Sequence, residues 1–344
     1  MGVKQLARRG LARTIGGLGL SPALARVFGG PAAILAYHRV LDPAIHDLEL
    51  VEPGMAVTKN AFANHLDLLR SRYRVIKLDE LVRTLLTGEK LLPGTVVITF
   101  DDGWLDTYEV AYPLLRKAGL PATVFVPSGL IGTDHPFWFS RAAALAAGVW
   151  QRRESLVRAF PEERMPAAAK FLPELLLKNL SRPAFVHAAL AGCKQAPPDQ
   201  RDAVIDFFDE LVDRKPTLRR ELVTWDELRE MAEDVFDVGS HTSTHVMLTE
   251  VGPVMAKVEL EESCRIIAEK LGRGPTSLCY PNGDNDESIR RLAARVGFAC
   301  SLTTDPGFIK PPLDLHALPR LGVHQGIAPD ADGLALLLSG IVGL

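Results

Sequence analysis

The chain has 344 residues, with 39 Lys and Arg against 42 Asp and Glu, so its formal net charge of −3 provides no overall field for nucleic acid. Apolar residues make up 47% of the sequence, which is typical of a folded globular protein and excludes an intrinsically disordered chain. The length exceeds that of the usual single domain, although a closed α/β barrel with insertions would use all of it.

The first 30 residues are predicted to form a basic leader. All six basic residues before position 42 precede the first acidic residue, and apolar residues lie between them. This pattern predicts a peripheral contact with an anionic membrane surface; the alternative is a poorly ordered leader. The basic residues are Lys4, Arg8, Arg9, Arg13, Arg26 and Arg39.

The expected location follows from the leader and the cysteines. The leader has neither the uniform apolar core nor the small-residue cleavage site of a signal peptide. Cys193, Cys264, Cys279 and Cys300 are scattered without a CxxC pair, which indicates reduced, buried thiols. We therefore expect the protein in the cytoplasm or at the periphery of a membrane.

Apolar runs alternate with segments of helical periodicity in two parts of the chain, 31–133 and 223–325. Helices are predicted between the runs, one of them capped by Thr58 and another ended by Gly119. This alternation predicts parallel βαβ units and therefore an α/β protein. About seven core strands are expected, at 32–37, 96–100, 122–126, 235–239, 277–280, 298–302 and 318–323.

Residues 134–222 have a different texture, rich in alanine and leucine and broken by prolines, and no comparable strand run occurs there. We interpret them as a helical insertion in the α/β core. Trp138 lies near its start, where it would line a substrate cleft or simply pack in a core. The last segment, 326–344, is predicted to be a packed C-terminal helix, because its apolar part is too short to span a bilayer.

Two predicted strands end in residues that carry chemistry. The run 96–100 ends at Asp101-Asp102-Gly103, and two adjacent carboxylates repel each other unless a cation or a proton lies between them. The alternative is an ordinary turn with a helix cap. The run 235–238 ends at Gly239-Ser240 and leads into His241-Thr-Ser-Thr-His245, where two histidines four residues apart would share one face of a helical turn and could bind one metal with a carboxylate. Capping or loop packing is the alternative for these histidines.

Together, Thr99-Phe100-Asp101-Asp102-Gly103 and His241–His245 resemble the first two motifs of the polysaccharide deacetylases, carbohydrate esterases related to chitooligosaccharide deacetylases. The resemblance implies a distorted seven-stranded (β/α) barrel, and the independent strand count agrees. It also implies that Asp101 is the catalytic base and that Asp102, His241 and His245 hold a divalent metal. Zinc is expected, with Co²⁺, Ni²⁺ or Fe²⁺ as alternatives.

A third family motif, usually Arg-Pro-Pro-Tyr-Gly, falls at Cys279-Tyr280-Pro281-Asn282-Gly283, where its arginine and tyrosine are missing. The backbone N–H of Asn282 could still serve the oxyanion. The missing arginine normally orients the base, and Arg320 is a candidate replacement, with a surface salt bridge as the alternative. Thr99 is expected to orient the carboxylates, and Trp104 and Tyr280 to stack on a sugar ring or pack in the core.

The family's usual C-terminal Leu-x-His motif is also missing from this chain. The stretch from 34 to 40, which contains Tyr37-His38-Arg39, is similar to the opening of a subgroup that resembles the poly-N-acetylglucosamine deacetylases. This similarity makes His38 the candidate acid. His316, or a simply buried His38, is the alternative.

The sequence therefore predicts a metal-dependent hydrolase that removes N-acetyl groups from amino sugars of a glycan or glycoconjugate. The substrate partner would be an N-acetylated carbohydrate, and no nucleic-acid partner is expected. Two alternatives stay open, a non-catalytic glycan-binding barrel and an amidase that acts on a non-sugar substrate.

Overall fold

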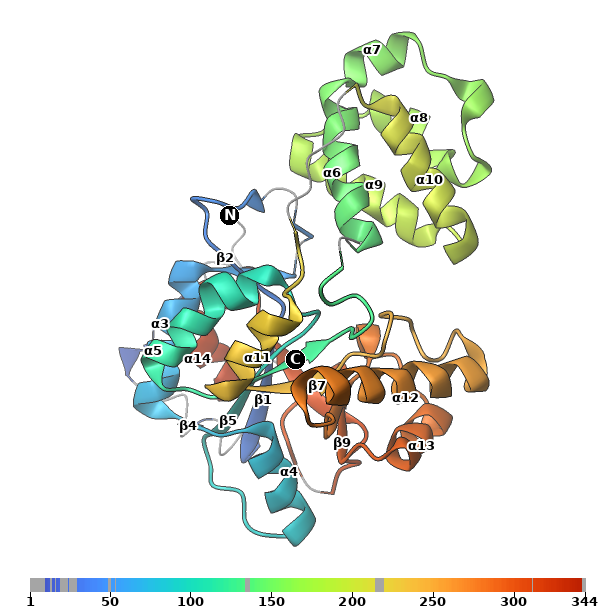
Figure 1. Cartoon of the computed structure of the whole chain (residues 1–344). Helices are drawn as coiled ribbons and strands as arrows, with labels where there is room; N and C mark the ends of the chain where they lie inside the picture. The colour runs from blue at the N-terminus through green and yellow to red at the C-terminus, as the bar shows by residue number, and fades with distance from the viewer. Residues whose placement is uncertain are drawn as a thin grey trace. The chain divides into compact units, whose positions relative to one another are not determined.

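The computed structural model (Figure 1) describes residues 10–12, 14–15, 17–18, 24, 30–48, 51–52, 54–133, 137–213, 220–310 and 312–341. The chain divides into two compact units. The barrel unit comprises Met1–Asp42, Gly54–Thr133 and Leu222–Leu344, and the helical unit comprises Pro43–Pro53 and Asp134–Glu221.

The segment 43–53 is the part of this division that the sequence did not indicate. It interrupts the stretch 31–133 that was assigned to the barrel, yet it belongs with the helical unit. Asp47 accepts a hydrogen bond from Arg182 at 2.8 Å, and Glu52 pairs with Lys194. Ion pairs between residues so distant in sequence leave no local pattern from which they could be read.

The barrel unit is a closed ring of seven parallel strands in the order β1-β10-β9-β8-β7-β6-β5, and β1 pairs back onto β5 to close it. This arrangement confirms the predicted α/β barrel, because each strand overlaps one of the seven apolar runs. The ring strands are β1 (Ala32–Tyr37), β5 (Thr95–Phe100), β6 (Ala122–Val126), β7 (Phe236–Ser240), β8 (Ser277–Cys279), β9 (Cys300–Pro306) and β10 (Leu318–Gly322).

Three further strands were not predicted, because each is only two or three residues long and too short to show a periodic pattern. β4 (Arg74–Val75) pairs with β5 outside the ring, and β2 (Arg39–Leu41) pairs with β3 (Ala56–Thr58) in a separate small sheet. Since only one residue separates the end of β1 from the start of β2, the pairing of β2 with β3 fixes the direction in which the chain leaves the barrel.

Helices surround the ring of strands (Figure 1). The first of them begins where it was predicted, because the Thr58 side chain accepts a hydrogen bond from the Ala61 N–H at 3.2 Å. The helical segments of the barrel unit are α3 (Lys59–Arg72), α4 (Leu78–Thr87), the π-helical η2 (Thr107–Ala111), α5 (Tyr112–Ala118), α11 (Trp225–Glu233), α12 (Gly252–Leu271), the short 3₁₀ turn η5 (Pro281–Gly283), α13 (Glu287–Val296) and α14 (Ala331–Ser339).

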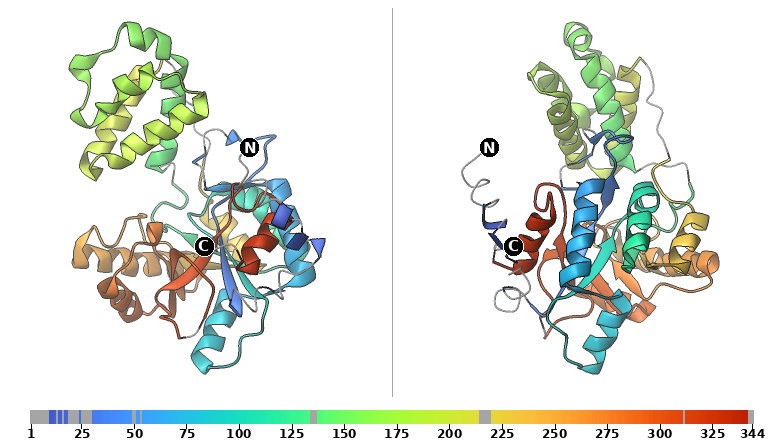
Figure 2. Two further views of the ribbon diagram at one scale, coloured as in Figure 1. Left: turned by 180° about the vertical axis from the view of Figure 1, so that it is seen from behind. Right: turned by 90° about the vertical axis from the view of Figure 1, so that its left-hand side faces the viewer.

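The C-terminal helix α14 packs beside α3, as both views in Figure 2 show. Of the leader, Ala12 and Ile15 are buried against Leu336 of α14. The five leader bases Lys4, Arg8, Arg9, Arg13 and Arg26 lie outside the described residues, so the membrane contact stays a prediction. Within the part of the chain that the structure describes, no helix combines the length and apolar character needed to cross a bilayer.

The helical unit is built from helices that bury one apolar cluster of alanine, leucine, valine and phenylalanine side chains. Gly192 lets α9 approach its neighbour, because a Cβ at this position would lie 2.5 Å from the Phe171 ring. The segments are α6 (Trp138–Gln151), α7 (Arg153–Arg158), the 3₁₀ turns η3 (Glu162–Arg164) and η4 (Ala167–Ala169), α8 (Phe171–Leu177), α9 (Arg182–Gln195) and α10 (Pro198–Leu211).

Strand register brings the candidate site residues to one end of the barrel. Tyr37 pairs with Phe100, so the next residues, His38 and Asp101, leave the sheet at the same level. Ser240 pairs with Leu278, which places His241 level with Cys279. The carboxyl ends of barrel strands are where (β/α) barrels place their active sites.

Candidate active site

Asp102, His241 and His245 meet at the carboxyl ends of β5 and β7. The Oδ1 atom of Asp102 lies 3.3 Å from Nε2 of His241 and 3.3 Å from Nε2 of His245. Two ligand atoms bound at about 2.1 Å to one tetrahedral ion stand about 3.4 Å apart, so these separations fit a shared metal. One carboxylate and two imidazoles are also a donor set that suits zinc and its neighbours in the periodic table. The residues present therefore fit a divalent cation.

The two histidines converge by a route that the sequence did not indicate. Residues 241–246 form a loop, not the helical turn that their spacing favoured. Thr242 and His245 both have positive φ, at 65° and 63°, and the Thr242 hydroxyl accepts the His245 N–H at 3.0 Å. The prediction of a shared helical face is wrong, because this left-handed loop turns the second imidazole back toward Asp102.

Residues with strained, left-handed backbone conformations cluster at the carboxyl end of the barrel strands. Among the described residues, the non-glycine residues with positive φ are Asp102, Thr242, His245 and Asn282. Such conformations cost about 1–3 kcal/mol each and persist where surrounding contacts hold them, commonly at functional sites. In this chain Glu259 supplies such contacts, because its buried carboxylate accepts the Ser243 and Thr244 N–H groups, each at 2.9 Å.

The orientation of the His241 ring is fixed by a hydrogen bond to the backbone of Cys279. Its Nδ1 donates to the Cys279 carbonyl oxygen at 2.7 Å, which leaves Nε2 with its lone pair directed at the carboxylate side. Burial alone would raise the pKa of Asp102, but the close contacts of its carboxylate with the His241 and His245 side chains outweigh burial and hold that pKa well below its usual range. The Asp102 carboxylate therefore stays ionised, as a metal ligand must.

Asp101 is held by Arg320 of β10. The guanidinium Nη1 donates to Asp101 Oδ1 at 2.8 Å, and Nη2 donates to Oδ2 at 2.7 Å, which is a two-pronged ion pair between side chains 1% and 2% exposed. Burial would raise the pKa of Asp101, but Arg320 outweighs it and keeps the pKa below the usual range. The surface salt bridge that was the alternative for Arg320 is excluded by its burial.

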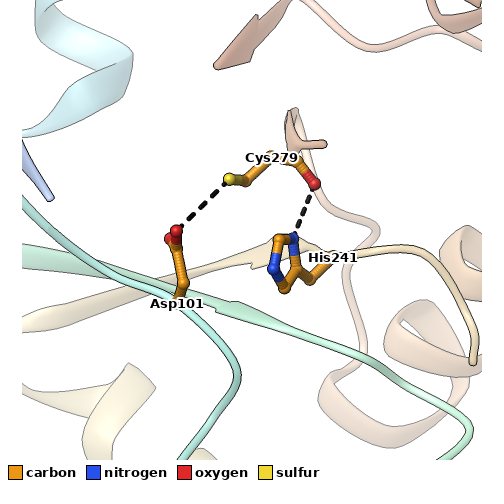
Figure 3. A group of neighbouring side chains, drawn as sticks. All are labelled: Asp101, His241 and Cys279. Atoms are coloured by element: carbon orange, nitrogen blue, oxygen red, sulfur yellow. Dashed lines mark hydrogen bonds between the residues drawn. The ribbon is translucent and has the colours of Figure 1, made fainter. Parts of the chain in front are cut away.

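Cys279 is the site residue that the sequence interpretation missed, since it was treated only as the place of an absent arginine. Its side chain reaches toward Asp101 while its backbone carbonyl holds His241 (Figure 3). The thiol lies 3.6 Å from Asp101 Oδ2, and Arg320 Nη2 lies 3.1 Å from Sγ. Burial raises the pKa of this thiol, so Cys279 stays a neutral group beside the ion pair.

His38 is a further neighbour of Asp101. Its Nε2 is 3.8 Å from Asp101 Oδ2, and its side chain is 25% exposed. The alternative acid, His316, has its Nδ1 within 3.1 Å of the Ser301 hydroxyl, and its carbonyl accepts the Tyr280 hydroxyl. The geometry therefore groups His38, and not His316, with the aspartate pair.

The prediction that Trp104 and Tyr280 stack on a sugar ring is wrong, because the two side chains are buried at 1% and 0% exposure. Trp104 instead donates its Nε1–H to Asp102 Oδ2 at 2.9 Å. Tyr280 packs in an apolar cluster with residues of α12 and α13. Both residues support the scaffold from within.

Two further predicted side chains lie elsewhere than expected. The Thr99 hydroxyl donates to the Leu35 carbonyl and accepts from Arg320, so Thr99 supports the arginine and acts on the carboxylates only through it. Trp138 is part of the helical unit, where the Arg201 guanidinium lies 4.4 Å from its ring centroid and the ring packs on the apolar cluster.

Pro281 and Asn282 form a tight turn after β8. Asn282 has φ of 56°, and the following Gly283 has φ of 77°. A Cβ at Gly283 would lie 2.2 Å from the Thr304 hydroxyl, so this glycine is required for close approach. The Asn282 amide group donates to Met247 Sδ at 3.1 Å, which turns its side chain toward the loop that follows His245.

The cluster of Asp102, His241 and His245 at the carboxyl ends of the barrel strands is typical of a (β/α)-barrel enzyme. The family profile described as polysaccharide deacetylase matches residues 88–169 and 185–301, more than half of the chain. The chain belongs to the polysaccharide deacetylase family, whose members are hydrolases that act on glycans. The predicted family is confirmed.

Individual relatives are distant in sequence. The curated protein YxkH of Bacillus subtilis (strain 168) is 21% identical over 281 residues, which cover 81% of this chain and 70% of YxkH. The chain is similar in fold to IcaB from Ammonifex degensii, with a TM-score of 0.57 at 19% identity over 90% of this chain and 98% of that one. The deacetylase PplD of Streptococcus pyogenes, solved with acetate, gives a TM-score of 0.56 at 18% identity over 90% and 97%.

Proposed function

We propose that this protein is a metal-dependent N-deacetylase, which converts an N-acetylated amino sugar of a glycan or glycoconjugate into the free amine and acetate. The observation that carries this proposal is the pair of unlike aspartates. Asp102 faces two imidazoles, whereas its neighbour Asp101 faces Arg320 and His38. The acetate bound to the related PplD supports an acetyl group as the reacting part of the substrate.

Asp102, His241 and His245 would hold the cation through Oδ1 and the two Nε2 atoms. A divalent ion there supplies a Lewis acid that polarises the acetyl carbonyl and lowers the pKa of a water molecule. Zinc is our first choice because the donors are two nitrogens and one oxygen, with Co²⁺, Ni²⁺ and Fe²⁺ as the other metals to be tested.

Asp101 acts as the general base in this mechanism. It accepts the proton of the attacking water at Oδ2, the carboxylate oxygen nearest to His38, while Arg320 holds the carboxylate in place. The neutral Cys279 thiol lies 3.6 Å from the same oxygen. Because Arg320 keeps the Asp101 carboxylate ionised, this base is ready to accept a proton at neutral pH.

The backbone N–H of Asn282 is proposed to donate to the oxygen that becomes negative on the acetyl carbon. His38 then gives the proton on Nε2 to the departing amine nitrogen, since an amine leaves poorly without one. The C–N bond breaks, the acetyl carbon keeps the water oxygen, and acetate and a free amino sugar result.

Acetate release tests the proposal. We expect the zinc-loaded protein to release acetate from N-acetylglucosamine oligosaccharides. The variant Asp101→Asn should retain the metal but lose at least ~100-fold in turnover, whereas His241→Ala should lose the metal itself. Release of acetate by Asp101→Asn at the wild-type rate would contradict the base assignment. Binding of the oligosaccharide without acetate release would favour a glycan-binding barrel, and release only from non-sugar amides would favour an amidase.

A further inference from the structure

Asp106 is a buried carboxylate that the mechanism above does not use. Its side chain lies five residues after Asp101 and is 1% exposed. Oδ1 accepts the Val40 N–H at 2.8 Å, and Oδ2 accepts Nε–H of Arg39 at 2.8 Å. Both oxygens therefore bind the two residues that directly follow His38.

The backbone on the other side of His38 is also anchored. The Asp101 N–H donates to the Tyr37 carbonyl at 3.0 Å, and the Tyr37 side chain is fully buried. The segment 101–106 after β5 thus holds the chain both before and after His38. Without Asp106, the chain after His38 would lose the only charged anchor among these contacts.

Arg39 links Asp106 to the proposed metal ligand Asp102 through Trp104. Its guanidinium carbon lies 4.3 Å from the centroid of the Trp104 ring, while Trp104 donates to Asp102. The π-helical segment η2 begins directly after Asp106, and such segments are frequent at functional sites. One short stretch therefore contains the base, a metal ligand, the donor to that ligand and the anchor of the candidate acid.

We propose that Asp106 is a positioning residue for the general acid His38, acting through Arg39 and Val40. This inference rests on the proposed function. The side chain of His38 is partly exposed and its contact with Asp101 Oδ2 is long, at 3.8 Å, so its position depends mainly on its backbone. A displacement of about 1 Å in a reacting group can cost ~100-fold in rate.

Leaving-group dependence tests this role. We would compare zinc-loaded wild type, His38→Ala, Asp106→Ala and the double variant on an N-acetylglucosamine oligosaccharide and on p-nitrophenyl acetate, whose leaving group needs little protonation. Asp106→Ala should lower kcat on the amide at least ~10-fold and on the ester less than ~3-fold, with KM nearly unchanged. The double variant should be no slower on the amide than His38→Ala, because the two residues serve one step.

Two controls separate positioning from folding. Asp237→Asn removes a carboxylate that pairs with Lys77 at the opposite end of a barrel strand, and it should leave both rates unchanged. Amide hydrogen exchange gives a readout apart from activity: exchange at Val40 should accelerate in Asp106→Ala, while β7 stays protected. Should Asp106→Ala fail to fold, Asp106→Asn keeps an acceptor for Val40 and should show the same selective loss at smaller size.

The outcomes are distinguishable. Equal losses on amide and ester in Asp106→Ala, or additive losses in the double variant, would overturn the positioning role while His38→Ala still shows a selective loss. A His38→Ala variant without selective loss on the amide would instead overturn the proposed acid, and the role of Asp106 with it.

Discussion

Buried charge distinguishes the barrel unit from the helical unit. At the mouth of the barrel, Asp101, Asp102, Asp106, Glu259 and Arg320 are all at most 6% exposed. In the described residues of the helical unit, every buried side chain is apolar. Each buried charge at the barrel mouth has a matched partner, because an unpaired charge in such a place costs several kcal/mol.

The difference shows what holds each unit together. The helical unit gains stability from apolar area removed from water, which tolerates substitutions of similar volume. The barrel mouth depends on specific donors and acceptors that cannot be exchanged one at a time. Changes in the two units should therefore have separable effects on stability and on turnover.

Removing Arg320 should produce the largest effect. Arg320→Leu leaves the Asp101 carboxylate buried without its counter-charge, so we expect the free energy of unfolding to fall by up to about 5 kcal/mol and turnover to fall at least ~100-fold. Urea unfolding and acetate release measure the two losses. Arg320→Lys keeps the charge but lacks the two-pronged geometry, and it should be less destabilised.

The double variant Arg320→Leu with Asp101→Asn provides the matched control, because it removes both charges together. It should be more stable than Arg320→Leu alone. A loss below about 1 kcal/mol in Arg320→Leu would show that water or another group compensates Asp101, and the contrast between the two units would fail at its strongest point.

Phe208→Ala tests the other side of the comparison. Phe208 is 0% exposed and its ring meets that of Phe171 at 6.4 Å, so we expect a loss of about 4 kcal/mol from the helical unit. Leu177→Ala, at a side chain 72% exposed, is the control and should change little. Zinc content should stay near one per chain in both variants. Loss of zinc in Phe208→Ala would show that the two units fold as one.

The predictable part of this structure is the part encoded locally. Apolar runs revealed all seven ring strands, and the rule that parallel strands present their carboxyl ends together was enough to gather His38, Asp101 and His241. Strand order and charge suffice for this grouping. The partner of Asp101 was proposed on another basis, because the arginine that orients the base in the resembling family is missing from the third motif and Arg320 lies in the last predicted strand.

The predictions that failed, and the residues that were missed, concern side chains whose roles depend on tertiary contacts. Trp104 beside the aspartate pair has the same sequence context whether it faces substrate or the interior, and its role as a donor to Asp102 requires the folded loop. Asp106 and Glu259 lie within segments of ordinary helical composition. Asp106 is paired with Arg39, and Glu259 accepts hydrogen bonds from the Ser243 and Thr244 amides. Neither pairing can be recognised without the three-dimensional structure.

His65, a buried polar residue outside the candidate active site, should make the stability of the barrel unit depend on pH. Its ring lies within hydrogen-bonding distance of the Tyr37 hydroxyl and the Asp330 carbonyl, and burial lowers the pKa of His65 to about 4 from 6.5. As pH falls below 6.5 the unfolded state takes up the proton first, so stability present at neutral pH is lost down to about pH 4. The total loss is about 3 kcal/mol.

Urea unfolding between pH 7 and 5 would measure the first part of this loss before most carboxylates titrate. His65→Gln, which does not titrate, should show a flatter stability profile over the same window. Identical slopes in the two proteins would mean that His65 takes up its proton equally in the folded and unfolded states, in contradiction to its depressed pKa.

The smallest expected effect concerns Glu259, whose carboxylate accepts two loop amides and the Thr244 hydroxyl. Glu259→Gln keeps one acceptor oxygen but loses the charge, so we expect about 1 kcal/mol of lost stability and ~10-fold weaker zinc binding, because the loop that positions His241 and His245 relaxes. Chelator competition measures the affinity. Glu261→Gln, on the same helix at an exposed pair with Lys257, is the matched control and should leave zinc affinity unchanged. Equal affinities in the two variants would show that the left-handed loop holds its shape without Glu259, and that its strain is borne by the barrel strands themselves.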